Sequence, residues 1–182
     1  MNADVRSIIY DPVSWIHPTR FLVPIKLASA RCRSVLNDII IYQYRLSTQV
    51  IDLANNKENY LANHWGVLGK AAFMAVCHRY RSSLAYNGLM LRLDPVTLQF
   101  TQSKLTASRD EVRGEITFDN LNYLACKELM AFSSTVSLAM KERIPLLFPE
   151  VVPKGNKHIL SASPVDNEIL IRMAIQHAKR NS

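Results

Sequence analysis

The feature that most constrains the fold of this chain is the spacing of its apolar residues, which recur every three or four positions along most of its 182 residues. This spacing matches the turn of an α-helix, whereas the alternation of apolar and polar residues that is typical of β-strands is rare. Glycine is scarce, with five in the whole chain. The pattern therefore predicts an all-α fold, a single compact multi-helix domain over residues 1–182.

The helix boundaries follow from local capping signals. Asp94 before Pro95 predicts a helix start, and Asn87-Gly88 predicts a helix end. The run Ile39-Ile40-Ile41 is apolar nearly all round, so we expect its helix to be central. Between about 101 and 117 the chain is polar and weakly patterned, which predicts an exposed, mobile loop. The predicted helices cover about 25–45, 57–65, 67–86, 119–132, 134–143 and 164–179.

Prolines mark two further segments. Asp11 before Pro12 predicts an N-cap and the first residue of a short helical turn, which Pro18 should end by disfavouring helical geometry at His17. The apolar residues of this turn that we expect to pack as an N-terminal clamp are Trp15 and Ile16. The second segment is predicted to be an extended plug in the core, because Pro145 should prevent a helix from crossing it. It comprises Ile144, Pro145, Leu146, Leu147, Phe148 and Pro149.

The composition is that of an ordinary globular protein, with 48% hydrophobic and 20% charged residues. No stretch resembles an export signal or reaches the roughly 18 to 20 apolar residues that cross a bilayer, so we expect no transmembrane segment. The net charge of +7 would suit an acidic partner, but the basic residues are scattered and form no run. A solvated surface is therefore the first interpretation of this charge.

No catalytic or metal-binding pattern is present in the sequence. The three cysteines are far apart, which is typical of a reducing compartment, and no two histidines have the spacing of a zinc helix. Cys77 and His78 are adjacent, so on a helix their side chains diverge by about 100° and do not form a dyad. We therefore expect no enzyme, no metal and no cofactor.

Several motifs together resemble the OrgA/MxiK family, also called SctK, of bacterial type III secretion systems. The N-terminal motif comprises Ile8, Ile9, Tyr10, Asp11, Pro12, Trp15, Ile16, His17, Pro18 and Arg20. Further stretches agree with the OrgA branch in the same order. They are Cys77-His78 with Arg81 and Leu84, Ile144 to Pro149, and Ala174 to Ala178.

The resemblance implies a structural adaptor in the bacterial cytoplasm, peripheral at the cytoplasmic face of the inner membrane within the injectisome. Proteins of this family belong to the sorting platform, where they join the cytoplasmic domain of the SctD-type ring protein to the SctQ-type pod protein. The pod protein in turn carries a SctL-type protein and the ATPase. The mechanism would be geometric, because a rigid helical body offers one surface to each partner.

Two surfaces are candidates for these partners. The first is a thin stripe of basic residues, for which a solvent-exposed face without a partner is the other interpretation. It comprises Lys70, His78, Arg81 and Arg92. The second is one side of the last helix, comprising Ile169, Arg172, Ile175 and Lys179. Because this helix is apolar on more than one face, burial in the core is its first interpretation and a partner its second.

Two alternatives stay open at the level of the sequence. A basic helical nucleic-acid-binding or regulatory protein would bind with an affinity that falls steeply with salt. An enzyme whose residues come together only in the fold would show a concave pocket with converging polar groups. The scattered charges count against the first alternative, and the missing motifs count against the second.

Overall fold

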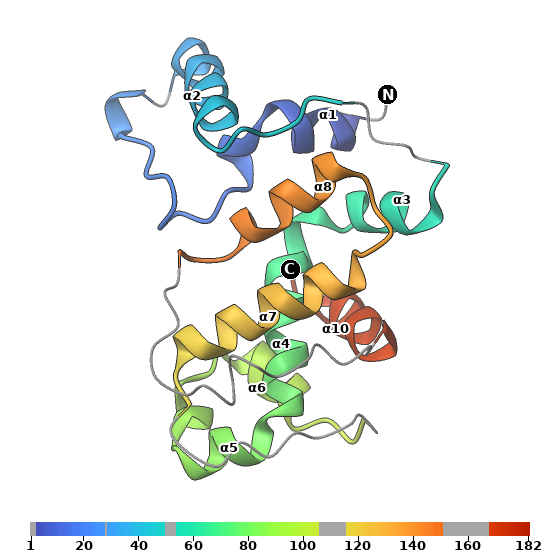
Figure 1. The fold of residues 1–182 in the computed structure, drawn as a ribbon. Helices are drawn as coiled ribbons and strands as arrows, with labels where there is room; N and C mark the ends of the chain where they lie inside the picture. Colours follow the sequence, from blue (N-terminus) through green and yellow to red (C-terminus); the bar gives the residue numbers. More distant parts are fainter. Residues whose placement is uncertain (1–2, 28, 50–53, 106–115, 151–167) are drawn as a thin grey trace. The chain divides into compact units, whose positions relative to one another are not determined.

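The structure is a computed structural model that describes residues 3–27, 29–49, 54–105, 116–150 and 168–182. Every regular element within these ranges is helical, which confirms the all-α prediction for the described part of the chain (Figure 1). The α-helices are α1 (Ala3–Tyr10), α2 (Ala30–Gln43), α3 (Asn56–Ala62), α4 (Leu68–Arg79), α5 (Arg81–Tyr86), α6 (Pro95–Thr101), α7 (Phe118–Phe132), α8 (Leu138–Arg143) and α10 (Glu168–Arg180). The 3-10 helices are η1 (Pro12–Ser14), η2 (Ile25–Leu27), η3 (Trp65–Val67), η4 (Leu89–Arg92) and η5 (Ile144–Leu147).

The described residues form two compact units. Of the described residues, the first unit contains 3–27, 29–49, 54–66 and 133–150, and the second contains 67–105, 116–132 and 168–182. The expectation that both belong to one domain over residues 1–182 stays a prediction.

The first unit joins segments that are distant in the sequence. Its N-terminal helix α1 contacts η1, α2 and α3. A buried carboxylate connects α3 to the start of α8, because Glu58 accepts hydrogen bonds from the backbone N–H of Ser137, at 3.0 Å, and from its hydroxyl. The unit therefore depends on long-range contacts between its first 66 residues and the segment 133–150.

Helix α2 is not central, contrary to the prediction from its apolar run. Leu36 and Ile40 are buried, but Val35, Ile39 and Tyr42 are exposed. The helix therefore buries one side only. The apolar run misled the prediction because periodicity locates apolar side chains without saying which of them are covered.

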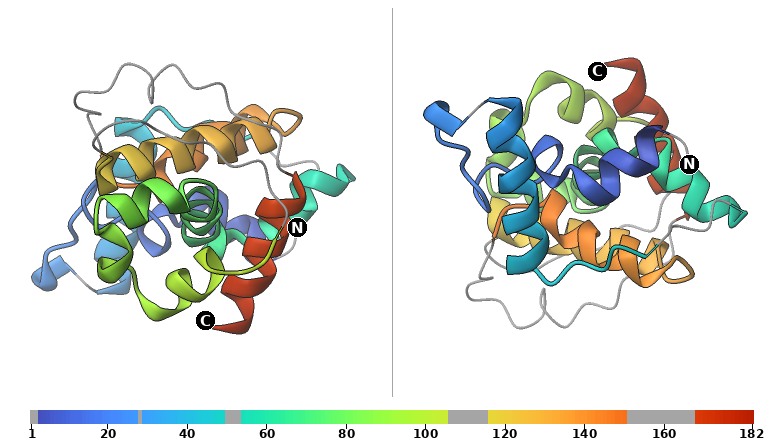
Figure 2. Two further views of the ribbon diagram at one scale, coloured as in Figure 1. Left: turned by 90° about the horizontal axis from the view of Figure 1, so that it is seen from below. Right: turned by 90° about the horizontal axis from the view of Figure 1, so that it is seen from above.

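The second unit is built around α4. This helix packs against α7, α10 and α6, and the left view of Figure 2 shows it nearly end on between α7 and α10. Ala71, Ala72 and Ala75 are fully buried, and such small side chains allow neighbouring helices to approach closely. The tight packing explains why almost every residue of α4 is buried.

The helix predicted over 67–86 is interrupted. α4 ends at Arg79, Tyr80 leaves helical geometry with a ψ of 22°, and α5 begins at Arg81. Tyr80 and Leu84 are nevertheless both buried, as the apolar arc predicted. The end at Gly88 is confirmed, since Gly88 has a φ of 67°, a left-handed conformation that favours glycine.

Local capping signals predicted the helix starts with mixed success. Asp94 caps α6, because its carboxylate accepts from the backbone N–H of Thr97 at 3.2 Å. The helix predicted from residue 119 begins at Phe118 as α7, and the hydroxyl of Thr117 before it accepts from the backbone N–H of Asn120 at 3.2 Å. Most of the loop expected over 101–117 lies outside the described residues.

The segment after Arg143 is buried, as predicted, but it is not an extended plug. Residues Ile144–Leu147 form η5, with Pro145 in its first turn, and only Phe148 is extended. Proline is tolerated in the first turn because its missing N–H has no helical partner there. Ile144, Leu146 and Phe148 bury their side chains.

Candidate protein-interaction site

The N-terminal motif begins with Asp11, which the structure uses differently from the prediction. Pro12 opens η1 as expected, but the Asp11 side chain does not cap this turn, which already ends before Trp15. Its carboxylate instead accepts two hydrogen bonds from the guanidinium of Arg33, at 2.9 and 2.6 Å, and one from the amide of Asn37 at 2.9 Å. Asp11 thus attaches the motif to α2.

The environment of Asp11 favours its ionised form. The hydrogen bond from Arg33 lowers the pKa of Asp11, and burial opposes this effect only in part. Asn37 is itself buried, and its carbonyl oxygen accepts from the backbone N–H of Val13 at 3.0 Å. One amide therefore connects both sides of the turn to α2.

The apolar residues of the motif pack as a clamp, but to different depths. Ile16 is buried in a small cluster with Ile40, Leu46 and Leu146. Trp15 is only half-buried: its Nε1 donates to the carbonyl oxygen of Ser7 at 3.3 Å. The remainder of the Trp15 ring borders the pocket described below.

The motif and the segment 144–149 are in direct contact. The backbone N–H of His17 donates to the carbonyl oxygen of Leu146 at 2.8 Å. Arg20 donates from Nε to the carbonyl oxygen of Phe148 at 2.6 Å and from Nη2 to that of Pro149 at 3.4 Å. Two stretches that resemble the family separately therefore form one structure. Of their remaining residues, Pro18 is exposed and Pro145 and Leu147 are half-buried.

The sequence interpretation missed the role of Arg143. This side chain is fully buried, and burial lowers its pKa to about 10. Its guanidinium donates to backbone carbonyl oxygens at distances of 2.8 to 3.1 Å, which belong to Ile8, Ile9, Ser47 and Ala139. Nothing in the sequence distinguishes this arginine from the exposed basic residues.

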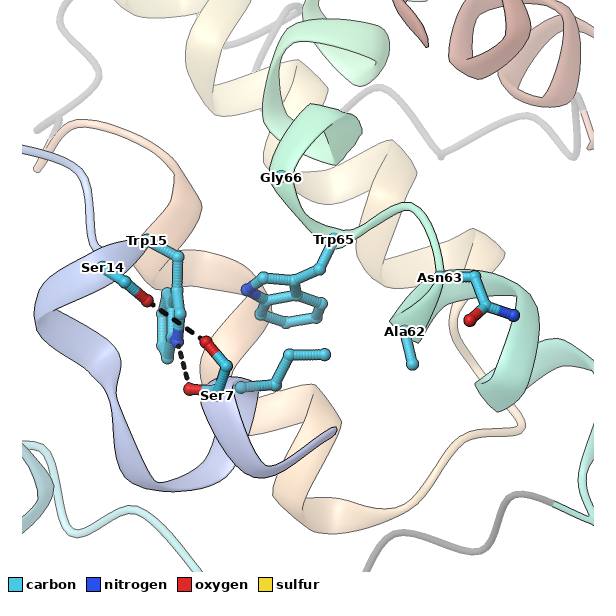
Figure 3. Close-up of a pocket in the computed structure, with 8 residues that line it drawn as sticks. Ser7, Ser14, Trp15, Ala62, Asn63, Trp65 and Gly66 are labelled. Atoms are coloured by element: carbon cyan, nitrogen blue, oxygen red, sulfur yellow. Dashed lines mark hydrogen bonds between the residues drawn. The ribbon is translucent and has the colours of Figure 1, made fainter. Parts of the chain in front are cut away.

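A pocket of about 300 Å³ opens beside the motif within the first unit (Figure 3). It is lined by Ser7, Ile8, Ser14, Trp15, Ala62, Asn63, Trp65 and Gly66. The rings of Trp15 and Trp65 meet edge to face, with centroids 5.5 Å apart. Trp65 is 6% exposed, and its Nε1 has no hydrogen-bond acceptor among the described residues.

The pocket suits a neutral side chain of a protein partner better than it suits catalysis. The hydroxyls of Ser7 and Ser14 lie 3.5 Å apart, but none of the lining residues is a base or an acid that would activate them. Two indole rings with hydroxyl and amide groups around them are typical of interface pockets. The sequence predicted Trp15 as a motif residue, whereas only the fold brings Trp65 and Gly66 beside it.

Two members of the predicted basic stripe, His78 and Arg81, contact backbone carbonyl oxygens inside the second unit. His78 is fully buried, and its ring nitrogens lie 3.2 and 3.3 Å from the carbonyl oxygens of Thr101 and Leu105. Arg81 is half-buried and donates to the carbonyl oxygen of Ser103 at 3.4 Å. His78 is therefore withdrawn as an interface candidate, because its helix turns it into the core.

The two remaining members of the stripe are exposed. Lys70 forms an ion pair with Asp94 at 3.5 Å. Arg92 lies over the ring of Phe118, 5.1 Å from its centroid. Both side chains are accessible, but they do not form a continuous basic surface with the buried histidine.

The predicted side of α10 is also divided. Ile175 is fully buried, so it is withdrawn as an interface candidate, whereas Ile169 and Lys179 are exposed. Arg172 is half-buried and forms an ion pair with Glu168 at 2.7 Å. The exposed apolar residue that the prediction missed on this helix is Met173.

Cys77 is buried, which raises the pKa of its thiol, and this group is therefore not poised as a nucleophile. In the described ranges, no cluster of histidine, cysteine or acidic side chains is suited to a metal ion. None of the helices in these ranges is long and apolar enough to cross a bilayer.

Comparison with known proteins identifies relatives over nearly the whole chain. Residues 5–180 match the family model OrgA_MxiK, described as a bacterial type III secretion apparatus protein. The chain is 26% identical over 177 residues to the oxygen-regulated invasion protein OrgA of Salmonella typhimurium strain LT2, covering 96% of this chain and 86% of that protein. It is 24% identical over 177 residues to the protein MxiK of Shigella flexneri, covering 96% and 88%. No solved structure matches the chain.

Proposed function

Because the chain belongs to the OrgA/MxiK family of bacterial type III secretion apparatus proteins, we propose that it is a non-catalytic adaptor of the secretion system. It links the cytoplasmic domain of the SctD-type ring protein to the SctQ-type pod protein and, through the pod, to a SctL-type protein. It acts at the cytoplasmic face of the inner membrane and supports the secretion of effectors. The relative from Salmonella is named an invasion protein, which agrees with such a role.

The observation that carries this proposal is that the charged side chains of the family motif, and the neighbouring Arg143, bind other groups of the same unit. Asp11 binds Arg33, Arg20 binds the carbonyl oxygens of Phe148 and Pro149, and Arg143 binds four carbonyl oxygens. These contacts stabilise the shape of the first unit and use the charged groups of the motif internally. An adaptor needs such a preorganised body, because rigidity lowers the entropic cost of binding.

The same reasoning disfavours the two alternatives. A nucleic-acid-binding protein needs accessible cations on one face, and the predicted basic stripe does not provide one, because His78 is buried and Lys70 is paired with Asp94. An enzyme needs an activated nucleophile in a pocket, and the described pocket has two serine hydroxyls but no acid or base to activate them.

The test is affinity purification of a tagged copy from its own bacterium, at moderate salt and with nuclease added. We expect the ring protein and the pod protein to be recovered together with the tagged chain. Recovery of neither protein, with nucleic acid retained when nuclease is omitted, would overturn the adaptor in favour of a basic nucleic-acid-binding protein.

A strain without the gene provides the second half of the test. Secretion of effectors should be lost and then restored by the untagged chain. In the same strain, the pod protein should no longer purify with the ring protein. Recovery of the ring and pod proteins together without this chain would show that the link does not depend on it.

A further inference from the structure

The outward side of α2 carries an apolar stripe that its own unit does not cover. Val35, Ile39 and Tyr42 are 57, 45 and 87% exposed. Their spacing of four and three residues places them on one face of the helix, beside the face that carries the buried Leu36 and Ile40. From Val35 to Tyr42 the stripe extends over about 10 Å, or two helical turns.

The segment before the helix also exposes apolar side chains. Leu22 and Ile25 are 81 and 94% exposed, and Leu27 is 38% exposed. Together with the stripe these residues make six large apolar side chains exposed within residues 22–42. Several large apolar side chains exposed so close together in the sequence are typical of a protein interface.

The charges around the stripe are mainly positive. Lys26, Arg31 and Arg45 are exposed, and within residues 22–45 the only acidic residue is Asp38. The charge of Arg33 is already compensated by Asp11 at 2.6 Å. The surface is therefore complementary to a segment that carries acidic residues beside its apolar ones.

We propose that this face of α2 binds an acidic amphipathic helix of a partner protein. The proposal rests on the adaptor function above and assigns a surface to one of its two partners. A partner helix with apolar residues at positions i, i+3, i+4 and i+7 would cover the stripe. Its acidic residues would meet Lys26, Arg31 and Arg45.

Asp38 argues for a protein rather than a lipid surface. It is exposed on the outward side of α2, between Val35 and Tyr42 in the sequence. Insertion of the stripe into a bilayer would bring this carboxylate toward hydrocarbon, which is costly, whereas a partner helix can provide a lysine or arginine for it. A second copy of this chain is also disfavoured, because it would bring two basic surfaces together.

The first experiment is site-specific photo-crosslinking in the bacterium that carries the secretion system. A photoreactive phenylalanine analogue replaces Tyr42 and, as a matched control, Tyr86, which is 89% exposed on α5. We expect residue 42, but not residue 86, to crosslink to an acidic amphipathic peptide of the ring or pod protein. The proposal would be overturned if residue 42 formed no crosslink, or formed crosslinks only within its own chain, to a second copy of the chain or to lipid.

The second experiment measures recovery of the two partners by variants of the tagged chain. Ile39→Glu and Tyr42→Glu should lower recovery of one partner by about tenfold or more and leave the other unchanged, because few interface residues carry most of the binding energy. The control Tyr86→Glu should recover both. Each variant must first match the wild type in helical content and unfolding midpoint, which we expect since these side chains are exposed.

The outcomes separate this inference from the proposed function. If wild type recovers both partners and the α2 variants do so equally well, the surface is wrong and the adaptor stands. If wild type recovers neither partner, the adaptor itself is wrong. Charge reversal provides an independent check: Arg31→Glu with Arg45→Glu should lower recovery of the same partner, and an unchanged recovery would exclude an acidic partner.

Discussion

The guanidinium of Arg143 donates to the carbonyl oxygen of Ile9 at 3.0 Å, although 134 residues separate them in the sequence. The same side chain binds three further carbonyl oxygens in the first unit. Backbone carbonyls at a helix end need such partners when they are buried. Arg143 therefore connects the end of α1, the loop at Ser47 and α8.

Removal of Arg143 should destabilise the first unit strongly. Arg143→Met keeps the length of the side chain but leaves buried carbonyl oxygens without donors, so we expect a loss of about 3 kcal/mol or more in the free energy of unfolding. Urea denaturation followed by circular dichroism measures this loss. Arg180→Met, at the exposed end of α10, is the control and should change little. Equal stability of the two variants would contradict the role of Arg143.

Asp11 should make the free energy of unfolding depend on pH in the acid range. Its pKa is lowered in the folded protein, mainly by the hydrogen bond from Arg33, so the stabilisation is complete above the ordinary value of 3.8 and is lost as pH falls through the lower folded value. Since the pair is partly exposed, we expect at most about 1 kcal/mol. Urea denaturation at neutral pH and near pH 3 should show a smaller acid loss for Asp11→Asn than for wild type. An identical pH dependence of wild type and Asp11→Asn would refute the prediction. The control is Asp38→Asn, which removes an exposed carboxylate outside the Asp11–Arg33 pair.

Truncation of Trp15 should cost less than truncation of a fully buried aromatic residue. The side chain is half-buried, so Trp15→Ala should lose about 1 to 2 kcal/mol in unfolding free energy. Thermal and urea denaturation measure the loss, and Trp15→Phe should recover most of it. A Trp15→Ala protein of unchanged stability that no longer recovers a partner would make Trp15 an interface anchor.

The two glycines beside helix ends should respond differently to alanine. A Cβ at Gly66 meets no atom within 4 Å, whereas Gly88 has a φ of 67°. Gly66→Ala should therefore leave stability nearly unchanged, while Gly88→Ala should lose about 1 kcal/mol because an L side chain is strained in this conformation. Urea denaturation distinguishes them. If Gly66→Ala is the more destabilised variant, the space beside Trp65 is smaller than described.

The same open space allows the pocket to be filled. Gly66→Leu should fold like the wild type but occupy part of the pocket, and recovery of a partner that inserts a side chain there should fall. Gly66→Ala is its matched control. Full recovery of both partners by Gly66→Leu would exclude the pocket from the interface.

The second unit contains a buried ion pair whose disruption should be severe. Arg79 and Glu128 lie 2.8 Å apart and are 1 and 3% exposed. Glu128→Gln removes the negative charge of this buried pair, so we expect a loss of about 3 to 5 kcal/mol in unfolding free energy, measured by urea denaturation. The double variant Arg79→Met with Glu128→Leu should be more stable than Glu128→Gln. Its failure to recover stability would argue against the ion pair as the cause.

Local signals were sufficient for much of the secondary structure. Asp94-Pro95 and Asn87-Gly88 act through the conformation of one or two residues and their nearest backbone groups, so their prediction needed no knowledge of the fold. Tyr80 was the exception in this region, since its departure from the helix is not signalled by any proline or glycine beside it. Pro145 was misinterpreted because its effect depends on whether it opens a helix or lies inside one.

The sequence by itself determined the all-α class, the end of α5 at Asn87-Gly88, the start of α6 at Asp94-Pro95 and the family resemblance, because periodicity, caps and motifs are properties of neighbouring residues. Only the tertiary structure decided which faces are covered. It buried His78 and Ile175, exposed Val35, Ile39 and Tyr42, and brought Trp65 beside Trp15. The physical reason is that burial depends on partners up to 134 residues away, as for Arg143 and Ile9, and no local pattern encodes the pairing of such distant groups.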